Sequence, residues 1–208
     1  QEPDGALEEL AFFIALGKLM PKLSVDSAVA MLEKGQDLYL RYGYTTIQDG
    51  RATPGNVKTA ITAATRKKLK ADVVAYPDII QPGSTELLSA PWYHDTTTVP
   101  TYRDRFRIGG VKLTLDGSPQ GKTAWLTKPY FKPPQGQKDN YAGYGVVPDA
   151  KAVEYYTTAL RNRWQILTHA NGDRAIDQLL VDFGKAREAV PGADVRPVLV
   201  HGQTLRED

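Results

Sequence analysis

The sequence predicts an α/β protein in which helices alternate with parallel strands. Segments with helical periodicity alternate with short β-rich segments along the whole chain, and 41% of the 208 residues are hydrophobic, which is enough to bury a substantial core. No internal repeat or linker interrupts this alternation. We therefore expect one domain covering residues 1–208, built on a parallel sheet, and neither a β-sandwich nor a helical bundle.

The first of these helices is expected between Ser24, a typical N-cap residue, and Gly43, which suits a left-handed C-terminal cap. Its apolar stripe is expected to contain Val25, Ala28, Met31 and Leu32. Further helices are expected at 55–69, 149–162 and 173–190. Strands are expected at 44–49, 72–76, 109–118, 164–169 and 197–201.

The strand predicted at 109–118 has one apolar and one polar face. Its alternating apolar residues are Val111, Leu113 and Leu115, and its polar residues are Lys112, Thr114 and Asp116. In a barrel of parallel strands the apolar face packs against the surrounding helices and the polar face points inward. The pattern therefore predicts that Lys112 points into the interior.

Two long segments, 77–101 and 119–148, show no regular pattern, and loops of this length in compact domains are more often functional than idle. The first contains His94 and could equally be a lid over a substrate site or a surface excursion. The second contains Trp125, whose large amphipathic ring could form a wall of a substrate site, although an aromatic side chain is more often simply packed. We retain His94 and Trp125 as candidate substrate-binding residues.

Lys112, His169 and His201 each lie at or near the carboxyl end of a predicted strand, where barrel enzymes build their active sites. The two histidines are about one strand–helix unit apart, so their imidazoles should project from neighbouring strands at the same height. Neighbouring neutral imidazoles are natural ligands for zinc, and the chain has no cysteine that could compete. A single histidine at a strand end is more often structural, so the residues alone leave both roles open.

An ammonium group inside a barrel is costly unless it is paired, neutralised or modified. Burial lowers the pKa of a lysine, and the neutral amine can add carbon dioxide to become a carbamate that bridges two divalent ions. A salt bridge from Lys112 to Asp116 or another inward carboxylate is the structural alternative. A Schiff-base lysine in a metal-free lyase, with a histidine shuttling protons, is the chemical alternative.

The segments IGGVKLTLDGSPQGKTAWLTKPY, QILTHANGDRAIDQLL, VRPVLVHGQ and GYTTIQDG resemble amidohydrolase family 3, whose members include N-substituted formamide deformylases and metal-dependent hydrolases. The resemblance implies a (β/α)8 TIM-type barrel. It also implies that Lys112 is carboxylated and bridges the metals, and that His169 and His201 are ligands from the fifth and sixth strands. These three residues would be both catalytic and metal-binding. The implied reaction is hydrolysis of a non-peptide amide, formamide or cyclic amide by a water activated by one or two divalent ions, with zinc as the expected metal.

The same resemblance predicts a partial barrel. The family pattern has a His-x-His pair on the first strand and an aspartate on the eighth, and neither can be located here. Five strands cannot close an eight-stranded barrel, for which ~250 residues is the usual length. We therefore expect a central fragment of about strands 2 to 6, truncated at both ends, which retains three of the expected ligands and could be inactive by itself.

The sequence has no basic cluster of the kind that binds nucleic acid or an anionic membrane, because its 26 basic and 24 acidic residues are spread along the chain. A small-molecule substrate is the expected partner. The apolar segment LAFFIAL is far shorter than the ~20 residues that span a bilayer, and Glu8 and Glu9 precede it where a signal peptide would be basic. A cytoplasmic location is slightly favoured, and the compartment stays undetermined.

A partial barrel would leave two open strand edges and an uncovered apolar face, which favour pairing with another copy. We therefore predict that the chain forms a homo-oligomer or self-associates through its open edges. Sedimentation velocity is expected to show species larger than the monomer that increase with concentration. A single monomeric boundary at every concentration would contradict this.

Overall fold

A computed structural model describes residues 5, 7–8, 10–89, 92 and 101–208. The candidate His94 lies outside the described residues. The elements are α1 (Leu10–Leu19), α2 (Val25–Arg41), β1 (Thr46–Ala52), α3 (Pro54–Thr65), β2 (Asp72–Pro77), the short 3₁₀ helix η1 (Glu86–Ser89), β3 (Phe106–Ile108), β4 (Gly110–Thr114), α4 (Asp149–Arg161), β5 (Gln165–Ala170), α5 (Asp173–Ala189) and β6 (Val198–His201).

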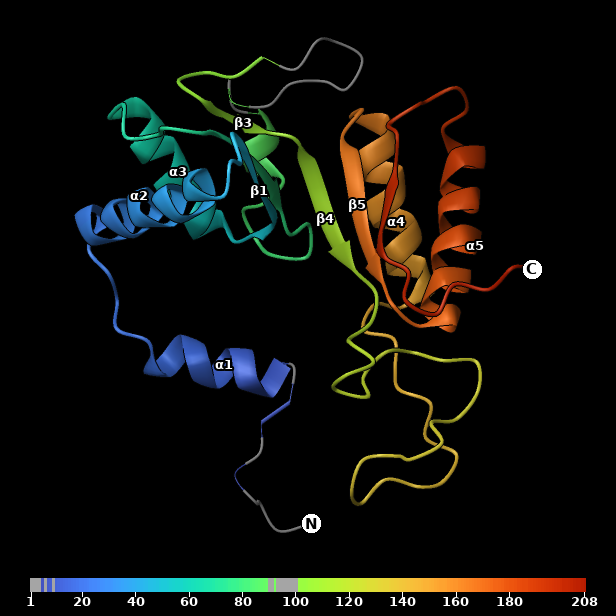
Figure 1. Cartoon of the computed structure of the whole chain (residues 1–208). Coiled ribbons are helices and arrows are strands. Elements are labelled where there is room, and N and C mark those ends of the chain that lie inside the picture. The colour runs from blue at the N-terminus through green and yellow to red at the C-terminus, as the bar shows by residue number, and fades with distance from the viewer. Residues whose placement is uncertain (1–4, 6, 9, 90–91, 93–100) are drawn as a thin grey trace.

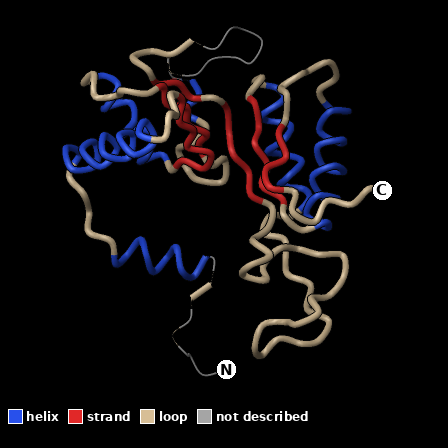
Figure 2. Tube along the Cα trace, viewed as in Figure 1, coloured by secondary structure: helices blue, strands red, loops and turns tan. Residues whose placement is uncertain are grey.

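The strands form two parallel sheets, β1-β2-β3 and β4-β5-β6. Helices α2 and α3 lie beside the first sheet, and α4 and α5 lie beside the second (Figures 1 and 2). A backbone bridge between Asp78 and Lys112 links the chain after β2 to β4, and the N–H of Ile79 donates to the carbonyl of Lys112 at 2.9 Å. The predicted α/β class with parallel strands is confirmed, and the sheets do not close.

The strand predicted at 109–118 corresponds to β4 (Gly110–Thr114), and a separate short strand, β3, directly precedes it. β3 pairs with β2, whereas β4 pairs with β5, and the change of partner falls at Gly109 and Gly110. Gly110 has φ +154°, and a Cβ at this position would overlap the carbonyl of Gln165 in β5. The strand also ends earlier than predicted, at Thr114, because the chain beyond it turns into a loop.

The main hydrophobic core lies between the strands and the helices. Val111, Leu113 and Leu115 are fully buried in it, as the alternation in this strand predicts. The opposite face carries a smaller buried cluster of Val74, Tyr76 and Leu167. Lys112 pairs in register with Leu167, and paired residues of parallel strands share a face. Lys112 therefore belongs to the face turned away from the helices.

The predicted apolar stripe of α2 is partly wrong. Val25 and Met31 are more than half exposed, and the most buried residues of the helix are Val29 and Gln36. The side-chain oxygen of Gln36 accepts the N–H groups of Lys70 and Ala71, at 2.7 and 3.2 Å. A polar contact to the chain before β2 thus sets which face of α2 is buried, and hydrophobicity alone does not reveal it.

Helix α1 presents most of its apolar side chains to solvent, including Phe12, Phe13 and Ile14. The centroid of the Phe13 ring lies 5.7 Å from the guanidinium carbon of Arg51, near the end of β1. Within the described residues, no helix combines the length and apolarity needed to cross a bilayer.

The glycine at the change of strand partner yields a stability prediction. Gly110→Ala is expected to destabilise the fold by at least about 2 kcal/mol, because the new Cβ would overlap the β5 backbone and the φ is strained for alanine. Gly35→Ala, in α2 with open space around it, should instead stabilise by about 0.5–1 kcal/mol. Urea unfolding measures both, and equal effects of the two substitutions would refute this account.

Candidate active site

Three polar side chains named from the sequence share the face of the second sheet that is turned away from the helices. In the register, Lys112 pairs with Leu167, and Thr114 pairs with His169 two residues further towards the carboxyl ends. His169 in turn pairs with Val200, next to His201. The carboxyl ends of β4, β5 and β6 therefore place Lys112, His169 and His201 along one edge of the sheet.

The imidazoles of His169 and His201 are in contact. Their ring centroids lie 4.6 Å apart with the planes at 79°. In register His201 pairs with Ala170, which is buried on the helix side. A regular strand would turn His201 to that side too, but its φ is +81°, in the left-handed region. This conformation costs about 1–2 kcal/mol and brings the ring beside His169.

Burial lowers the pKa of His201, and the neighbouring charges of His169 and Lys112 lower it further, against the opposing effect of Asp116. A lowered pKa favours the neutral imidazole at physiological pH. Neutral imidazole is the form that binds a metal ion.

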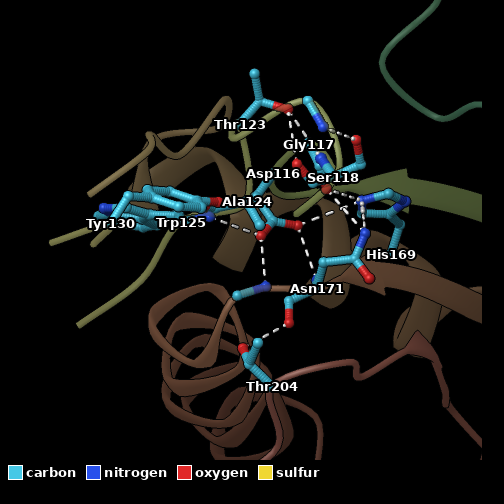
Figure 3. Close-up of polar contacts among 12 residues, drawn as sticks. Asp116, Gly117, Ser118, Thr123, Ala124, Trp125, Tyr130, His169, Asn171 and Thr204 are labelled. Atoms are coloured by element: carbon cyan, nitrogen blue, oxygen red, sulfur yellow. Dashed lines mark hydrogen bonds and ion pairs between the residues drawn. The ribbon is translucent and has the colours of Figure 1, made fainter. Parts of the chain in front are cut away.

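Asp116 connects the loop after β4 to the turn that follows β5, beside His169 (Figure 3). Its side chain is fully buried just beyond β4, and its Oδ1 accepts the N–H of Asn171 at 2.9 Å. Its Oδ2 accepts the N–H groups of Gly172 and Trp125, at 2.7 and 2.9 Å. A single carboxylate therefore holds the loop after β4 against the turn between β5 and α5.

The same contacts fix the orientation of His169. Its Nε2 lies 2.9 Å from the carbonyl oxygen of Gly117 and 3.3 Å from Asp116 Oδ1. Both are acceptors. Asn171 Nδ2, a donor, also lies 3.3 Å from Nε2, but it donates to the Gly117 carbonyl at the shorter distance of 2.9 Å. The two acceptors therefore assign the proton to Nε2 and the lone pair to Nδ1. Gly117 is itself held, because its carbonyl also accepts from the Asn171 side chain at 2.9 Å. A partner of this kind on one ring nitrogen is typical of histidines that bind metal through the other.

Lys112 is buried, with 4% of its surface exposed. Burial and, to a smaller extent, the charge of Arg51 lower the pKa of Lys112 to about 8, against the opposing effect of Asp78. The proposed alternative of a Lys112–Asp116 salt bridge is not formed, because Asp116 is engaged by backbone N–H groups and His169. Within the described part of the chain, Lys112 has no salt bridge.

Trp125 lies on the side of Asp116 opposite His169 (Figure 3). The guanidinium carbon of Arg174 lies 4.8 Å from its ring centroid, and its carbonyl accepts the N–H of Arg174. Its ring contributes to a hollow beside α4 and α5 lined also by Asp149, Gln178 and Asp182. The structure thus does not bring Trp125 to the two imidazoles, and its role as a substrate wall stays a prediction.

The donor set fits part of a metal site. Two adjacent imidazoles and a lysine with lowered pKa supply nitrogen ligands and a group that could become anionic. Among the described residues, no group of three or more His, Cys, Asp or Glu side chains could hold a metal ion. A complete metal shell therefore needs Lys112 in a modified form or ligands beyond this set.

Sequence reasoning missed Arg51 and Asp78, which act on Lys112, and the anchoring role of Asn171. The inward position of Asp116 was predicted, but not its backbone partners, which lie between 9 and 56 residues away. Asn171 carries a buried Oδ1, and Thr114 a buried hydroxyl, for which the described residues offer no partner. Asn171 follows His169 by two residues, and Thr114 pairs with His169 in the sheet. This proximity to a predicted site residue was the signal that could have identified them.

A model of the amidohydrolase family matches residues 1–208. The chain belongs to the amidohydrolase family. The resemblance seen in the Lys112 and HANGDRA segments is therefore confirmed.

The chain is similar in fold to two solved structures of uncharacterized metal-dependent hydrolases. The one from Pyrococcus horikoshii OT3 has a TM-score of 0.63 and 21% identity, over 88% of this chain and 37% of that one. The one from Pyrococcus furiosus has a TM-score of 0.66 and 24% identity, over 90% of this chain and 39% of that one. The chain thus spans less than two fifths of either neighbour. No curated protein matches it.

The Asp116 network can be tested directly. Asp116→Asn should destabilise the fold by about 2–4 kcal/mol, because the amide places an NH₂ group against buried backbone N–H donors. Asp26→Asn removes a carboxylate from an exposed pair with Arg66 and should cost less than about 1 kcal/mol. Urea unfolding compares the two, and a cost for Asp116→Asn no larger than that of Asp26→Asn would exclude the anchoring role.

Proposed function

We propose that this amidohydrolase is part of a metal-dependent hydrolase that cleaves a non-peptide carbon–nitrogen bond, in an amide, formamide or cyclic amide, with a metal-activated water. The observation that carries the proposal is the contact between His169 and His201 at the carboxyl ends of neighbouring parallel strands, on the face that also holds Lys112. This edge is where barrel enzymes assemble their active sites.

We further propose that the two sheets form one stretch of a (β/α)8 barrel, about strands 2 to 6, within a single domain. The parallel order, the Asp78–Lys112 bridge between the sheets and the helices beside them support this. The chain's span of 37% and 39% of its two neighbours is consistent with a fragment of a longer barrel. Strands β1 and β6 are the outer strands of this arrangement, so they are the edges through which self-association would occur.

In this function Nδ1 of His169 and the neutral ring of His201 would hold a divalent ion, with zinc as the expected metal. When bound, the ion would polarise the substrate carbonyl and lower the pKa of a coordinated water. Asp116 and Gly117 keep the proton on Nε2 of His169, which leaves Nδ1 as the donor atom. The restriction to amides, formamides and cyclic amides follows only from the family resemblance.

Lys112 would complete the ligand set as a carbamate. The neutral Nζ would attack the carbon of carbon dioxide, so that an N–C bond forms as one C=O π bond breaks, and one proton would pass from the nitrogen to water, which yields an anionic carbamate. Burial keeps a substantial fraction of the amine neutral near pH 8, because it lowers the pKa to about 8. The chemistry of the lysine thus converts a cation that is costly to bury into a bidentate anion.

A Schiff-base lyase is the second candidate, because the same buried Lys112 lacks a salt bridge within the described residues and could attack a carbonyl. Borohydride would then trap a carbonyl substrate on Lys112. A carbamate at Lys112, seen by ¹³C NMR after labelling with ¹³C-bicarbonate, would exclude this candidate. A third possibility is that the fragment by itself is non-catalytic, and it is compatible with a hydrolytic parent protein.

The proposed metal ligands are tested by measuring the metal content of the full-length protein by elemental analysis. Lys112→Ala and His201→Ala should each lower bound metal and amide hydrolysis at least about tenfold, because each removes a direct ligand. Lys70→Ala, which removes an exposed lysine paired with Asp37, should change neither. If metal content and hydrolysis both survive the first two substitutions, the proposed roles are wrong.

A further inference from the structure

A second cation lies beside Lys112 and has no role in the chemistry described so far. Arg51, near the carboxyl end of β1, donates from Nε to Oδ2 of Asp78 at 3.1 Å. Its side chain is 49% exposed, whereas that of Asp78 is 3% exposed. The pair therefore has one end fixed inside the protein and one end open to solvent.

Asp78 is held firmly. Its N–H donates to the carbonyl of Ala52 at 3.0 Å, and its backbone bridges to Lys112. Its Oδ1 accepts the N–H of Ile80 at 3.2 Å, so only Oδ2 is left for Arg51. A carboxylate fixed in this way can orient the arginine that binds it.

The two terminal nitrogens of the Arg51 guanidinium, Nη1 and Nη2, are available to another ligand. Asp78 uses Nε, and among the described residues no hydrogen bond involves Nη1 or Nη2. The ring of Phe13, 5.7 Å from the guanidinium carbon, is a cation–π partner, and such a partner occupies a guanidinium face and leaves its edge available. Two parallel N–H groups on that edge match the two oxygens of a carboxylate.

The place of Arg51 ties it to the candidate active site. Arg51 binds the side chain of Asp78, and the backbone of Asp78 pairs with that of Lys112, so one residue connects Arg51 to β4. Asp78 contacts only Nε of Arg51. An anionic group on a ligand would pair with the part of the guanidinium that Asp78 does not contact.

We propose that Arg51 binds a carboxylate of the substrate, so that the protein selects amides that carry a carboxylate over neutral amides of the same shape. This inference rests on the proposed hydrolytic function for the identity of the reacting group. Arg51 would be a specificity-determining residue, and Asp78 a positioning residue that acts through it.

Binding to the metal-free protein tests the inference without any turnover. The probes are N-formylglycine and its neutral isostere N-formylglycinamide, titrated by calorimetry. The unmodified protein is expected to bind N-formylglycine at least about tenfold more tightly, the size of a charge-assisted bidentate pair. Arg51→Met should reduce this ratio to about threefold or less, and Arg51→Gln is the second variant with the same expectation if Arg51→Met does not fold.

Arg105→Met is the matched control. Arg105 donates to Asp72 at 3.1 Å and is 55% exposed, so it resembles Arg51 in partner, distance and exposure, but Asp72 begins β2 at the opposite end of the strand. This variant should keep the tenfold ratio. The inference is overturned if the unmodified protein shows no preference, if the Arg51 variants keep it, or if Arg105→Met loses it equally.

Hydrolysis of the two probes by the metal-loaded protein is measured separately. Absence of hydrolysis of amides in general would contradict the proposed function, while the affinity ratio would still decide on Arg51. A hydrolase with equal affinities for the two probes would keep the proposed function and refute the inference.

Discussion

The candidate site depends on one buried carboxylate. Asp116 accepts three backbone N–H groups, from Trp125, Asn171 and Gly172, and lies 3.3 Å from Nε2 of His169. Loop and turn segments have few regular hydrogen bonds of their own, and buried N–H groups without partners would each cost free energy. The carboxylate satisfies these donors at the point where β4 and β5 end. The orientation of His169 is therefore a consequence of how the backbone is held, and the site inherits its geometry from a structural interaction.

The two histidines reach each other by different routes. His169 continues the regular alternation of β5 and needs only its acceptors to fix the ring. His201 reaches the same place through a left-handed backbone conformation at the last residue of β6. Strain of this kind persists when surrounding contacts determine it, and it is concentrated at functional sites. The contact between the rings joins the two residues that the sequence resemblance names as ligands, and their role in metal binding stays a prediction.

The sequence predicted the parts of the fold that depend on local patterns. The alternation in β4 identified Lys112 as facing away from the helices, and the spacing of His169 and His201 placed them on neighbouring strands. It failed where distant contacts decide. The buried face of α2 is set by Gln36, whose partners lie more than thirty residues away, and Arg51 depends on Asp78, 27 residues further on. The break at Gly109 and Gly110 depends on the approach of β5, which no local pattern encodes.

Beneath Lys112, on the same face, the buried side chains of Val74, Tyr76 and Leu167 form a floor, and the hydroxyl of Tyr76 closes it by donating to the Gln165 side chain at 2.7 Å. Water therefore has poor access to the lysine from the amino ends of the strands. The surroundings of its Nζ are apolar towards the amino ends of the strands and polar towards their carboxyl ends. The field of a charge at the carboxyl edge is therefore weakly screened on the apolar side. The hydrophobic floor thus acts as a dielectric boundary that strengthens each electrostatic contact made at the opposite edge.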